Sequence, residues 1–322
     1  MSALSSKLAE ALSRRSPLLN QFEAFRLVDG VGDDLPSLFI DKFGPVALAH
    51  LHEAASISPT AIESALKSAP WSGVGVTTVY LRIHRRASKE TAESSPSLVM
   101  GPATEKFKIS EHGVSYFVNP SQQVNAGLFL DMREVRERLI RESVGKKILN
   151  LFCFTGSLGI SAYVGKANFV TQVDSSKSAL SWGKENLELN ESEEVSGEIK
   201  FISEDAFAFV SRECRRGGAR YDRIIIDPPS FGRSKKGTFS FTDNAGTLVA
   251  ECISILKSGG DLILTTNKRD FDTDDVLQIV HEQAKTKGRR LSSHQLLLPP
   301  ASDFTASGED SIAMKGIWAV VS

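Results

Sequence analysis

Long hydrophobic runs and an excess of either charge are both missing from this chain of 322 residues. Charged residues interrupt even its most apolar stretches before the length of about eighteen residues that a membrane-spanning helix needs, so we expect no membrane segment. The N-terminal segment carries Lys7 and Glu10 and lacks the apolar core of a secretory signal. Because the formal net charge is −1, any basic surface that holds nucleic acid must be local.

Cysteine is also scarce. Cys153, Cys214 and Cys252 are far apart and form no Cys-x-x-Cys pair, which argues against a zinc site, an iron–sulfur cluster or a disulfide framework. The sequence therefore predicts no metal and a reducing, cytoplasmic location. A hydrophobic content of 41% is enough for a sizeable core, and the length favours one large domain and one smaller one.

The first part of the chain, residues 1–101, alternates short β-like runs with turn-forming residues and predicts a small α+β domain. Its N-terminus has the apolar spacing of a short amphipathic helix, and the polar stretch 88–97 is expected to be a solvated loop or linker. We expect this domain to take part in recognising the substrate. Just after it, a hairpin is predicted around Gly113.

In the second part, residues 102–322, apolar strands alternate with helical segments from Lys146 onward. This order predicts an α/β fold with a Rossmann-like parallel sheet and helices on both faces. The last two strands, near 292–298 and 312–321, are joined by a loop and are expected to form an antiparallel hairpin at the sheet edge. We therefore predict a seven-stranded Rossmann-like sheet with a smaller N-terminal α+β domain.

Three consecutive predicted strands end in a glycine loop or an acid. The loop with Gly156 leads from the first strand into a helix, and Asp174 ends the second strand. Glu204 and Asp205 end the third strand. A carboxylate at the second strand end can bind the two hydroxyls of a ribose. Asp is also a common helix cap, which is the alternative role of each acid. Because the glycine loop and the acids follow three consecutive strands, we favour a nucleoside site, with the acid after the third strand within reach of the adenine edge.

The glycine spacing separates two possible cofactors. A dinucleotide site carries Gly-x-Gly-x-x-Gly, so that the pyrophosphate rests on the helix N-terminus. Here Phe154 precedes Gly156 at the corresponding spacing. The looser loop suits a ligand without phosphate, such as S-adenosylmethionine, and makes NAD the weaker alternative.

Asp227-Pro228-Pro229 follows the fourth predicted strand, at the edge where open sheets bind ligands. The prolines donate no hydrogen bond, so the Asp227 carboxylate and nearby carbonyls are left to accept from an amino group or a ring N–H. Phe231 can stack on a planar base or pack under the loop. Asn267, after the fifth strand, can donate and accept toward a base edge. Methyl transfer from a sulfonium needs orientation more than a strong base.

Basic residues that could meet RNA phosphates occur in three short clusters, although such clusters are often only solvated faces. They are Arg82, Arg85 and Arg86, then Lys235 and Lys236, then Lys268 and Arg269. The sequence does not show whether they form one surface.

The ordered motifs 125–133, 149–156, 173–180 and 227–231 resemble those of the large-subunit ribosomal RNA methyltransferases that act on cytosine-C5 or guanine-N7. The resemblance runs from about Phe25 to the C-terminus and implies an RNA base as methyl acceptor. It implies a donor pocket lined by Asp131, Arg133, Phe152, Thr155, Gly156, Asp174, Asp205 and Asp227. Relatives often begin with an RNA-binding PUA domain, and the short segment before Phe25 leads us to expect none here.

The absence of a cysteine after the fifth strand indicates which atom of the base receives the methyl group. Cytosine-C5 methylation needs a thiolate that adds to C6, and the cytosine-specific relatives carry that Cys after the fifth strand. This chain has Thr265-Thr266-Asn267 there, and Asn267-Lys268-Arg269 resembles the guanine-N7 branch. We therefore predict transfer to a base nitrogen, of guanine in large-subunit rRNA. A cytosine-C5 enzyme, a methyltransferase for a small molecule or protein side chain, and a non-catalytic nucleotide-binding module are the alternatives.

Overall fold

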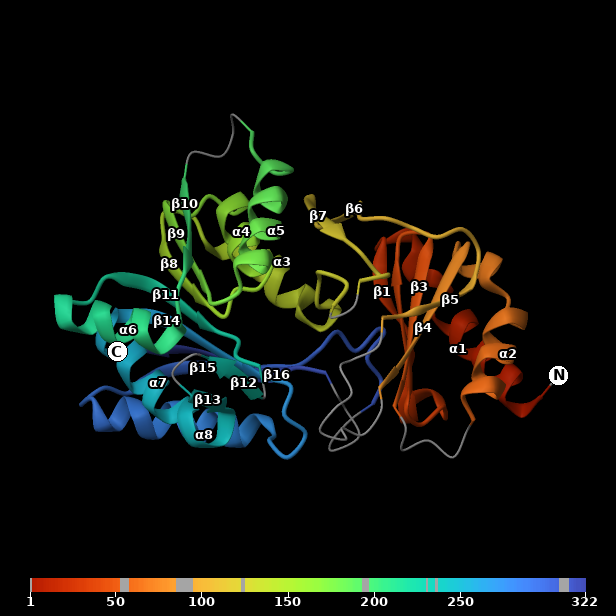
Figure 1. Ribbon diagram of the computed structural model, residues 1–322. Coiled ribbons are helices and arrows are strands. Elements are labelled where there is room, and N and C mark those ends of the chain that lie inside the picture. Colours follow the sequence, from red (N-terminus) through yellow and green to blue (C-terminus); the bar gives the residue numbers. More distant parts are fainter. Residues whose placement is uncertain are drawn as a thin grey trace. The chain divides into compact units, whose positions relative to one another are not determined.

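The computed structural model describes residues 2–52, 58–84, 95–122, 125–192, 197–229, 231–234, 237–306 and 313–322. They form two compact units, each with its own core (Figure 1). The first unit consists of Met1–Asp131 and Pro300–Ser311, and the second of Met132–Pro299 and Ile312–Ser322. In the ranges given above, no helix is both long enough and apolar enough to cross a membrane.

A five-stranded sheet organises the first unit, with the strands in chain order and only β3 and β4 parallel. Its strands are β1 (Ala24–Asp29), β2 (Leu38–Phe43), β3 (Val46–His52), β4 (Thr78–His84) and β5 (Ser97–Met100). The helices α1 (Ala3–Arg15) and α2 (Pro59–Ser68) bury Leu8, Leu12 and Ile62 in the core of this unit. Because α2 connects two parallel strands, it is a crossover helix, as parallel pairing requires.

The predicted α+β character of this unit is confirmed, with two additions. The helix α2 and the strand β5 were not predicted, and Ser97 begins β5 although the sequence analysis placed it in a linker. Residues 88–94 of that linker lie outside the described residues. Short 3-10 turns lie at Ser16–Asn20, Gly30–Asp33 and Trp71–Val74.

The predicted hairpin around Gly113 is confirmed and belongs to the first unit. It consists of β6 (Phe107–Glu111) and β7 (Val114–Val118), which pair antiparallel across His112 and Gly113. Ser110 N donates to Glu23 Oε2 at 2.8 Å, which attaches the hairpin to the rest of the unit. The first unit therefore extends to Asp131, beyond the boundary after Gly101 used in the sequence analysis.

A segment near the C-terminus also returns to the first unit. Asp303 Oδ2 accepts from Arg26 N at 2.9 Å, and Asp29 Oδ2 accepts from Thr305 N and Ala306 N, each at 2.7 Å. These contacts join residues more than 270 positions apart in sequence, with separations of 276 and 277. The first unit is thus made from two separate stretches of chain.

The second unit contains a seven-stranded sheet in the order β10-β9-β8-β11-β14-β16-β15. The first five strands are parallel, and β16 is antiparallel to both of its neighbours. Their bounds are β8 (Lys147–Leu151), β9 (Phe169–Asp174), β10 (Glu198–Ser203), β11 (Tyr221–Ile226), β14 (Leu256–Thr266), β15 (Leu291–Leu297) and β16 (Lys315–Val321). The predicted seven-stranded Rossmann-like sheet is confirmed. Of the terminal hairpin, only β15 is an edge strand, because β16 lies between β14 and β15.

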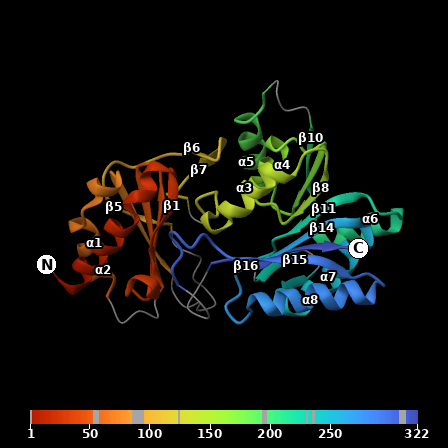
Figure 2. The ribbon, with the colours of Figure 1, turned by 180° about the vertical axis from the view of Figure 1, so that it is seen from behind.

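Helices cover both faces of this sheet (Figure 1, Figure 2). One face carries α3 (Arg133–Glu142), α4 (Ser157–Val164) and α5 (Lys177–Glu188), and the other carries α6 (Ala206–Arg216), α7 (Phe241–Ile255) and α8 (Thr273–Thr286). Successive side chains of a strand point to opposite faces, so Ile225 packs with α3 and α4 while Ile224 and Ile226 pack with the other helices. The strands β12 (Phe231–Ser234) and β13 (Gly237–Ser240) form a separate pair. The helix α8 was not predicted.

Candidate functional site

The strand register of the second unit brings the predicted site residues to one edge of the sheet. Leu151 of β8 pairs with Val173 of β9 and with Ile226 of β11. Ser203 of β10 pairs with Asp174, and Ile226 also pairs with Leu264 of β14. The segments that follow these pairs therefore lie side by side along the carboxyl ends of the strands. In sheet order they are 204–205, 174, 152–156, 227–229 and 265–267.

The loop after β8 has an uncommon backbone. Phe152, Phe154 and Gly156 have φ angles of 57°, 50° and 78°. Glycine adopts positive φ without penalty, but a bulky aromatic residue does so at a cost of about 1–3 kcal/mol. Two such residues in five positions mean that the surrounding structure must hold this loop in place.

Two buried amide side chains hold the loop from below. Gln172 on β9 donates from Nε2 to the carbonyl of Gly156 at 2.9 Å and accepts from Asn150 Nδ2 at 2.7 Å. Asn186 on α5 donates from Nδ2 to the carbonyl of Thr155 at 3.1 Å. Gln172 and Asn186 are both fully buried, so these bonds are shielded from water. Gln172 and Asn150 were not recognised in the sequence analysis, because their partners are set by strand pairing.

We expect the Gln172→Met variant to lose both of these bonds and to leave the Asn150 amide buried without its acceptor. Such a loss costs about 1–3 kcal/mol, so the melting temperature should fall. The affinity for S-adenosylhomocysteine should fall as well, because the loop is then less firmly held. Thermal melts with and without S-adenosylhomocysteine measure both effects. A variant that is destabilised yet binds the nucleoside as tightly as the original chain would contradict a role in shaping the loop.

The hydrogen bonds of the loop decide which kind of cofactor fits. Cys153 N donates to the carbonyl of Val173 at 3.0 Å, Phe154 N to Asp174 Oδ2 at 2.9 Å, and Gly156 N to the carbonyl of Cys153 at 2.7 Å. These amides are used inside the protein and are not directed at a phosphate, as they would be in a dinucleotide site. The residues present therefore fit a nucleoside donor without phosphate, in agreement with the sequence analysis.

The two predicted nucleoside-binding acids have different surroundings. Both oxygens of Asp174 accept backbone hydrogen bonds, from Phe154 N at 2.9 Å and from Ser176 N at 2.8 Å. A carboxylate has about four acceptor positions, so Asp174 keeps capacity for ribose hydroxyls. Asp205 caps α6 by accepting from Ala208 N at 3.1 Å, which is the alternative role that the sequence analysis considered. Both side chains are half-buried.

Asp227 is oriented by a neighbouring strand. The hydroxyl of Thr265 on β14 donates to Asp227 Oδ1 at 2.5 Å. Thr265 is fully buried, whereas Asp227 is half-buried. Pro228 is buried and Pro229 is exposed, so the chain after Asp227 leaves the sheet toward solvent. In the sequence, Thr265 stands out only because no cysteine occupies its position. In the structure its hydroxyl contacts Asp227, the residue predicted to accept a hydrogen bond from the base.

The remaining predicted site residues are placed as follows. Asn267 is exposed directly after β14, and Phe231 begins β12 with its side chain outside the described part of the structure. Asp131 is half-buried in a 3-10 turn (Leu130–Met132) at the end of the first unit, and Arg133 is buried at the start of α3. Their roles stay predictions. Of the basic clusters, residues 85–86 and 235–236 lie outside the described residues, and Lys268 pairs with Asp270.

None of the three cysteines has the properties of a reactive thiol. Burial and the nearby Asp174 raise the pKa of Cys153 well above its usual range. Burial likewise raises the pKa of Cys252 well above that range and raises the pKa of Cys214. All three therefore stay protonated near neutral pH, and a protonated thiol is a poor nucleophile. In the part of the chain that the structure describes, no three His, Cys, Asp or Glu side chains are grouped as a metal site requires.

Comparison with protein families gives a match over residues 60–299 to the family model described as S-adenosylmethionine-dependent methyltransferase. Among curated relatives, the ribosomal RNA large subunit methyltransferase K/L of Colwellia psychrerythraea is 29% identical over 79% of this chain. The protein of the same name from Hahella chejuensis is 37% identical over 53% of the chain. The matched regions are 35% and 23% of those proteins, so the chain spans at most about a third of their length.

Solved structures show the same fold along nearly the whole chain. A putative S-adenosylmethionine-dependent methyltransferase from Streptococcus mutans superposes with a TM-score of 0.81 and 24% identity, over 99% of this chain and 82% of the other. A putative methyltransferase complexed with SAH gives a TM-score of 0.80 with the same identity and coverage. Trm5b from Pyrococcus abyssi gives 0.58 with 18% identity, over 86% of this chain and 73% of the other. At these identities the likeness establishes the fold alone.

Proposed function

This chain belongs to the family of S-adenosylmethionine-dependent methyltransferases, and we propose that it transfers the methyl group to a nitrogen of a guanine base in large-subunit ribosomal RNA. The observation that carries the proposal is Asp227, held by Thr265 beside the loop that fits the donor. The names of the relatives from Colwellia and Hahella support RNA as the substrate class. A ribosomal RNA acceptor would also agree with the cytoplasmic location expected from the sequence.

The arrangement suits a displacement that depends on orientation. When bound, S-adenosylmethionine supplies a methyl group on a positively charged sulfur, so the reaction needs in-line alignment more than a strong base. Asp227 would accept a hydrogen bond from a base N–H and thereby fix the direction of the nitrogen lone pair. As the nitrogen–carbon bond forms and the sulfur–carbon bond breaks, the nitrogen loses a proton, which the Asp227 carboxylate can take up.

A carboxylate also distinguishes among the nitrogens of guanine. The exocyclic amine at N2 carries hydrogens, whereas N7 is only an acceptor. Asp227 is therefore better matched to a nitrogen that carries hydrogen than to N7. The Asp227 carboxylate therefore favours a different atom from N7, the atom methylated by the branch that Asn267-Lys268-Arg269 resembles.

The cytosine-C5 alternative makes a separate prediction about the thiols. Serine in place of Cys153, Cys214 or Cys252 should leave turnover within about a few-fold of the original value, with any loss coming from packing. RNA that contains 5-fluorocytosine should form no covalent adduct with the protein, because a stable adduct needs a thiolate attack on C6. Denaturing gels and methyl-transfer rates measure the two outcomes. An adduct that disappears with one of these substitutions would assign cytosine C5 as the acceptor.

The proposal is tested by giving the purified protein tritium-labelled S-adenosylmethionine and unmodified ribosomal RNA. We expect label in the RNA, and mass spectrometry of the digested nucleosides should identify a methylguanosine. Label that appears instead in free nucleosides, in metabolite extracts or in protein would favour a small-molecule or protein acceptor. Binding of the donor without any transfer would favour the non-catalytic module.

A further inference from the structure

Charge differs between the two edges of the sheet in the second unit. At the amino-end edge, six connections lead from helices into strands, and four of them are rich in basic residues. These four are residues 144–147 before β8, 215–220 before β11, 257–260 in the first part of β14 and 287–290 before β15. Together they carry nine Lys or Arg and no Asp or Glu, although the whole chain has a formal net charge of −1. At the opposite edge, the segments after β9, β10 and β11 carry acids.

We call the nine side chains the basic edge. They are Lys146, Lys147, Arg215, Arg216, Arg220, Lys257, Lys287, Arg289 and Arg290. The strands β8, β11 and β14 are neighbours in the sheet, so three of the four connections lie next to one another. The fourth is joined to them by Arg289, which donates to the carbonyl of Lys257 at 2.8 Å. The four connections therefore lie along one edge of the sheet.

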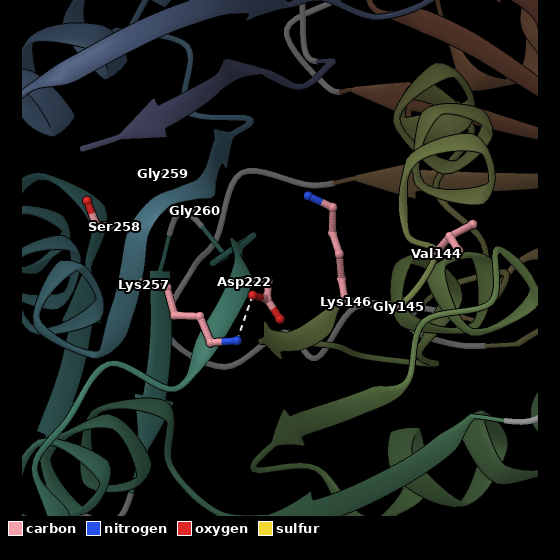
Figure 3. Close-up of a pocket in the computed structure, with 8 residues that line it drawn as sticks. All are labelled: Val144, Gly145, Lys146, Asp222, Lys257, Ser258, Gly259 and Gly260. Carbon is pink, nitrogen blue, oxygen red and sulfur yellow. Dashed lines mark hydrogen bonds and ion pairs between the residues drawn. The ribbon is translucent and has the colours of Figure 1, made fainter.

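A hollow of about 350 Å³ lies at this edge (Figure 3). The ends of three neighbouring strands line it, and its charged side chains are Lys146, Lys257 and Asp222. Figure 3 shows Lys257 extended to Asp222, with 2.7 Å between Nζ and Oδ1. Lys146 pairs with Asp261 at 2.9 Å. The lining of the hollow is thus mainly polar.

Internal structure uses some of these cations but not all. Arg289 donates to the carbonyls of Ile253 and Leu256 at 2.8 Å each, near the end of α7, where a cation is favoured by the helix dipole. The carboxylates that pair with the basic edge are Asp222, Asp261 and Glu213. Three carboxylates cannot neutralise nine cations, so the basic edge keeps an excess of positive charge.

Three members of the basic edge are directed to solvent. Arg215, Lys287 and Arg290 are exposed, and no described carboxylate pairs with them. Burial raises the pKa of Cys214, and Lys287 and Arg215 both oppose that effect, so each lies within electrostatic range of this thiol.

We propose that the basic edge binds the phosphodiester backbone of the RNA substrate, away from the nucleotide that is methylated. The proposal rests on the RNA acceptor proposed above and assigns a second contact area to it. Proteins bind nucleic-acid phosphates through clustered Lys and Arg side chains that outnumber the neighbouring carboxylates. Such contacts position the nucleic acid but do not recognise its sequence. β11 has six residues, so at about 3.3 Å per residue the two edges are about 20 Å apart.

An RNA can span that separation. A B-form duplex advances about 3.4 Å for each phosphate of one strand and an A-form RNA duplex somewhat less, so roughly six to seven base pairs cover the length of β11. A folded RNA of modest size therefore reaches from Asp227 around the unit to the basic edge. Free guanosine does not, which makes the basic edge a feature that would favour structured RNA over small acceptors.

The test compares two double variants by fluorescence anisotropy. One carries Arg215→Gln and Lys287→Gln on the basic edge. The matched control carries Lys184→Gln and Lys200→Gln, which are exposed lysines on α5 and β10. The probe is a fluorescein-labelled hairpin transcript of large-subunit ribosomal RNA. Each lost phosphate contact should reduce the slope of log affinity against log salt by about 0.7 to 0.9. The Kd should therefore rise about tenfold or more at about 0.1 M salt for the first variant only.

The outcomes separate this inference from the proposed function. A raised Kd and a reduced salt slope in the basic-edge variant, with S-adenosylhomocysteine affinity unchanged and the control variant normal, support the inference. Equal RNA affinity of the two variants, while the original chain still methylates the transcript, overturns it and leaves the proposed function intact. If the original chain neither binds nor methylates RNA, the RNA acceptor itself is wrong, and the basic edge has no RNA to hold.

Discussion

Asparagine in place of Asp227 is expected to lower the rate of methyl transfer by about 100-fold or more, with little change in the affinity for S-adenosylhomocysteine. Asparagine keeps one oxygen that can accept from the Thr265 hydroxyl, now 2.5 Å from Asp227 Oδ1. It replaces the other oxygen with an NH2 group, which repels the N–H of the acceptor base and cannot take up a proton. Misalignment of about 1 Å at a reacting group is enough for such a loss.

Alanine at position 227 should abolish detectable transfer but is a less clean test. It would leave the buried Thr265 hydroxyl without its acceptor, at a cost of about 1–3 kcal/mol in stability. The two effects are separated by single-turnover rates for chemistry and by calorimetry with S-adenosylhomocysteine for donor binding. A normal transfer rate in the Asp227→Asn variant would show that the acceptor base is oriented by other groups.

Thr265 gives the matched control for this experiment. Serine at position 265 keeps the hydroxyl, whereas valine keeps the shape and removes the hydrogen bond to Asp227. We therefore expect Thr265→Ser to stay close to the original rate and Thr265→Val to lose kcat with a smaller change in KM. Equal rates for serine and valine would mean that the hydroxyl stabilises β14 without positioning Asp227.

The sheet of the second unit could be predicted because its strands are short, continuous apolar runs. Residues 224–226 are three isoleucines, all buried between two layers of helices, as expected for a central parallel strand. Asp174 and Asp227 come directly at the ends of such runs, so their place at one edge also followed from the pattern. The helix α8 was missed although it has a capping box at Asp272 and Asp275 and buries Val276, Val280 and Ala284.

Contacts between distant residues were not predictable in the same way. Thr265 and Asp227 are 38 positions apart and meet because β11 and β14 are adjacent. Gln172 reaches Gly156 across the pairing of β8 and β9. The return of Asp303 to the first unit depends on a bond to Arg26 at a separation of 277 positions. Local periodicity carries no information about such pairs, so the support of the loop and the extent of the first unit needed the structure.

The identity of the donor is tested most directly at Asp174. Alanine at this position should weaken S-adenosylmethionine binding by about 1.5–3 kcal/mol, or about 10- to 150-fold in Kd, through loss of hydrogen bonds between the ribose and a charged group. Part of the effect will come from the loop, since Asp174 also accepts from Phe154 N and Ser176 N. The Gln172→Met variant measures that part, because it loosens the same loop and keeps the carboxylate.

Asp275→Ala is the matched acid control for Asp174→Ala. Asp275 lies in the first turn of α8, where its side chain accepts from Asp272 N at 2.9 Å, so its loss should lower stability but leave donor affinity unchanged. Calorimetry with S-adenosylmethionine, S-adenosylhomocysteine and NAD completes the comparison. The loop amides of Cys153, Phe154 and Gly156 are bonded inside the protein, which is why NAD should bind weakly or not at all. Tight binding of NAD and none of the sulfur nucleosides would contradict both the fit of the loop and the role of Asp174.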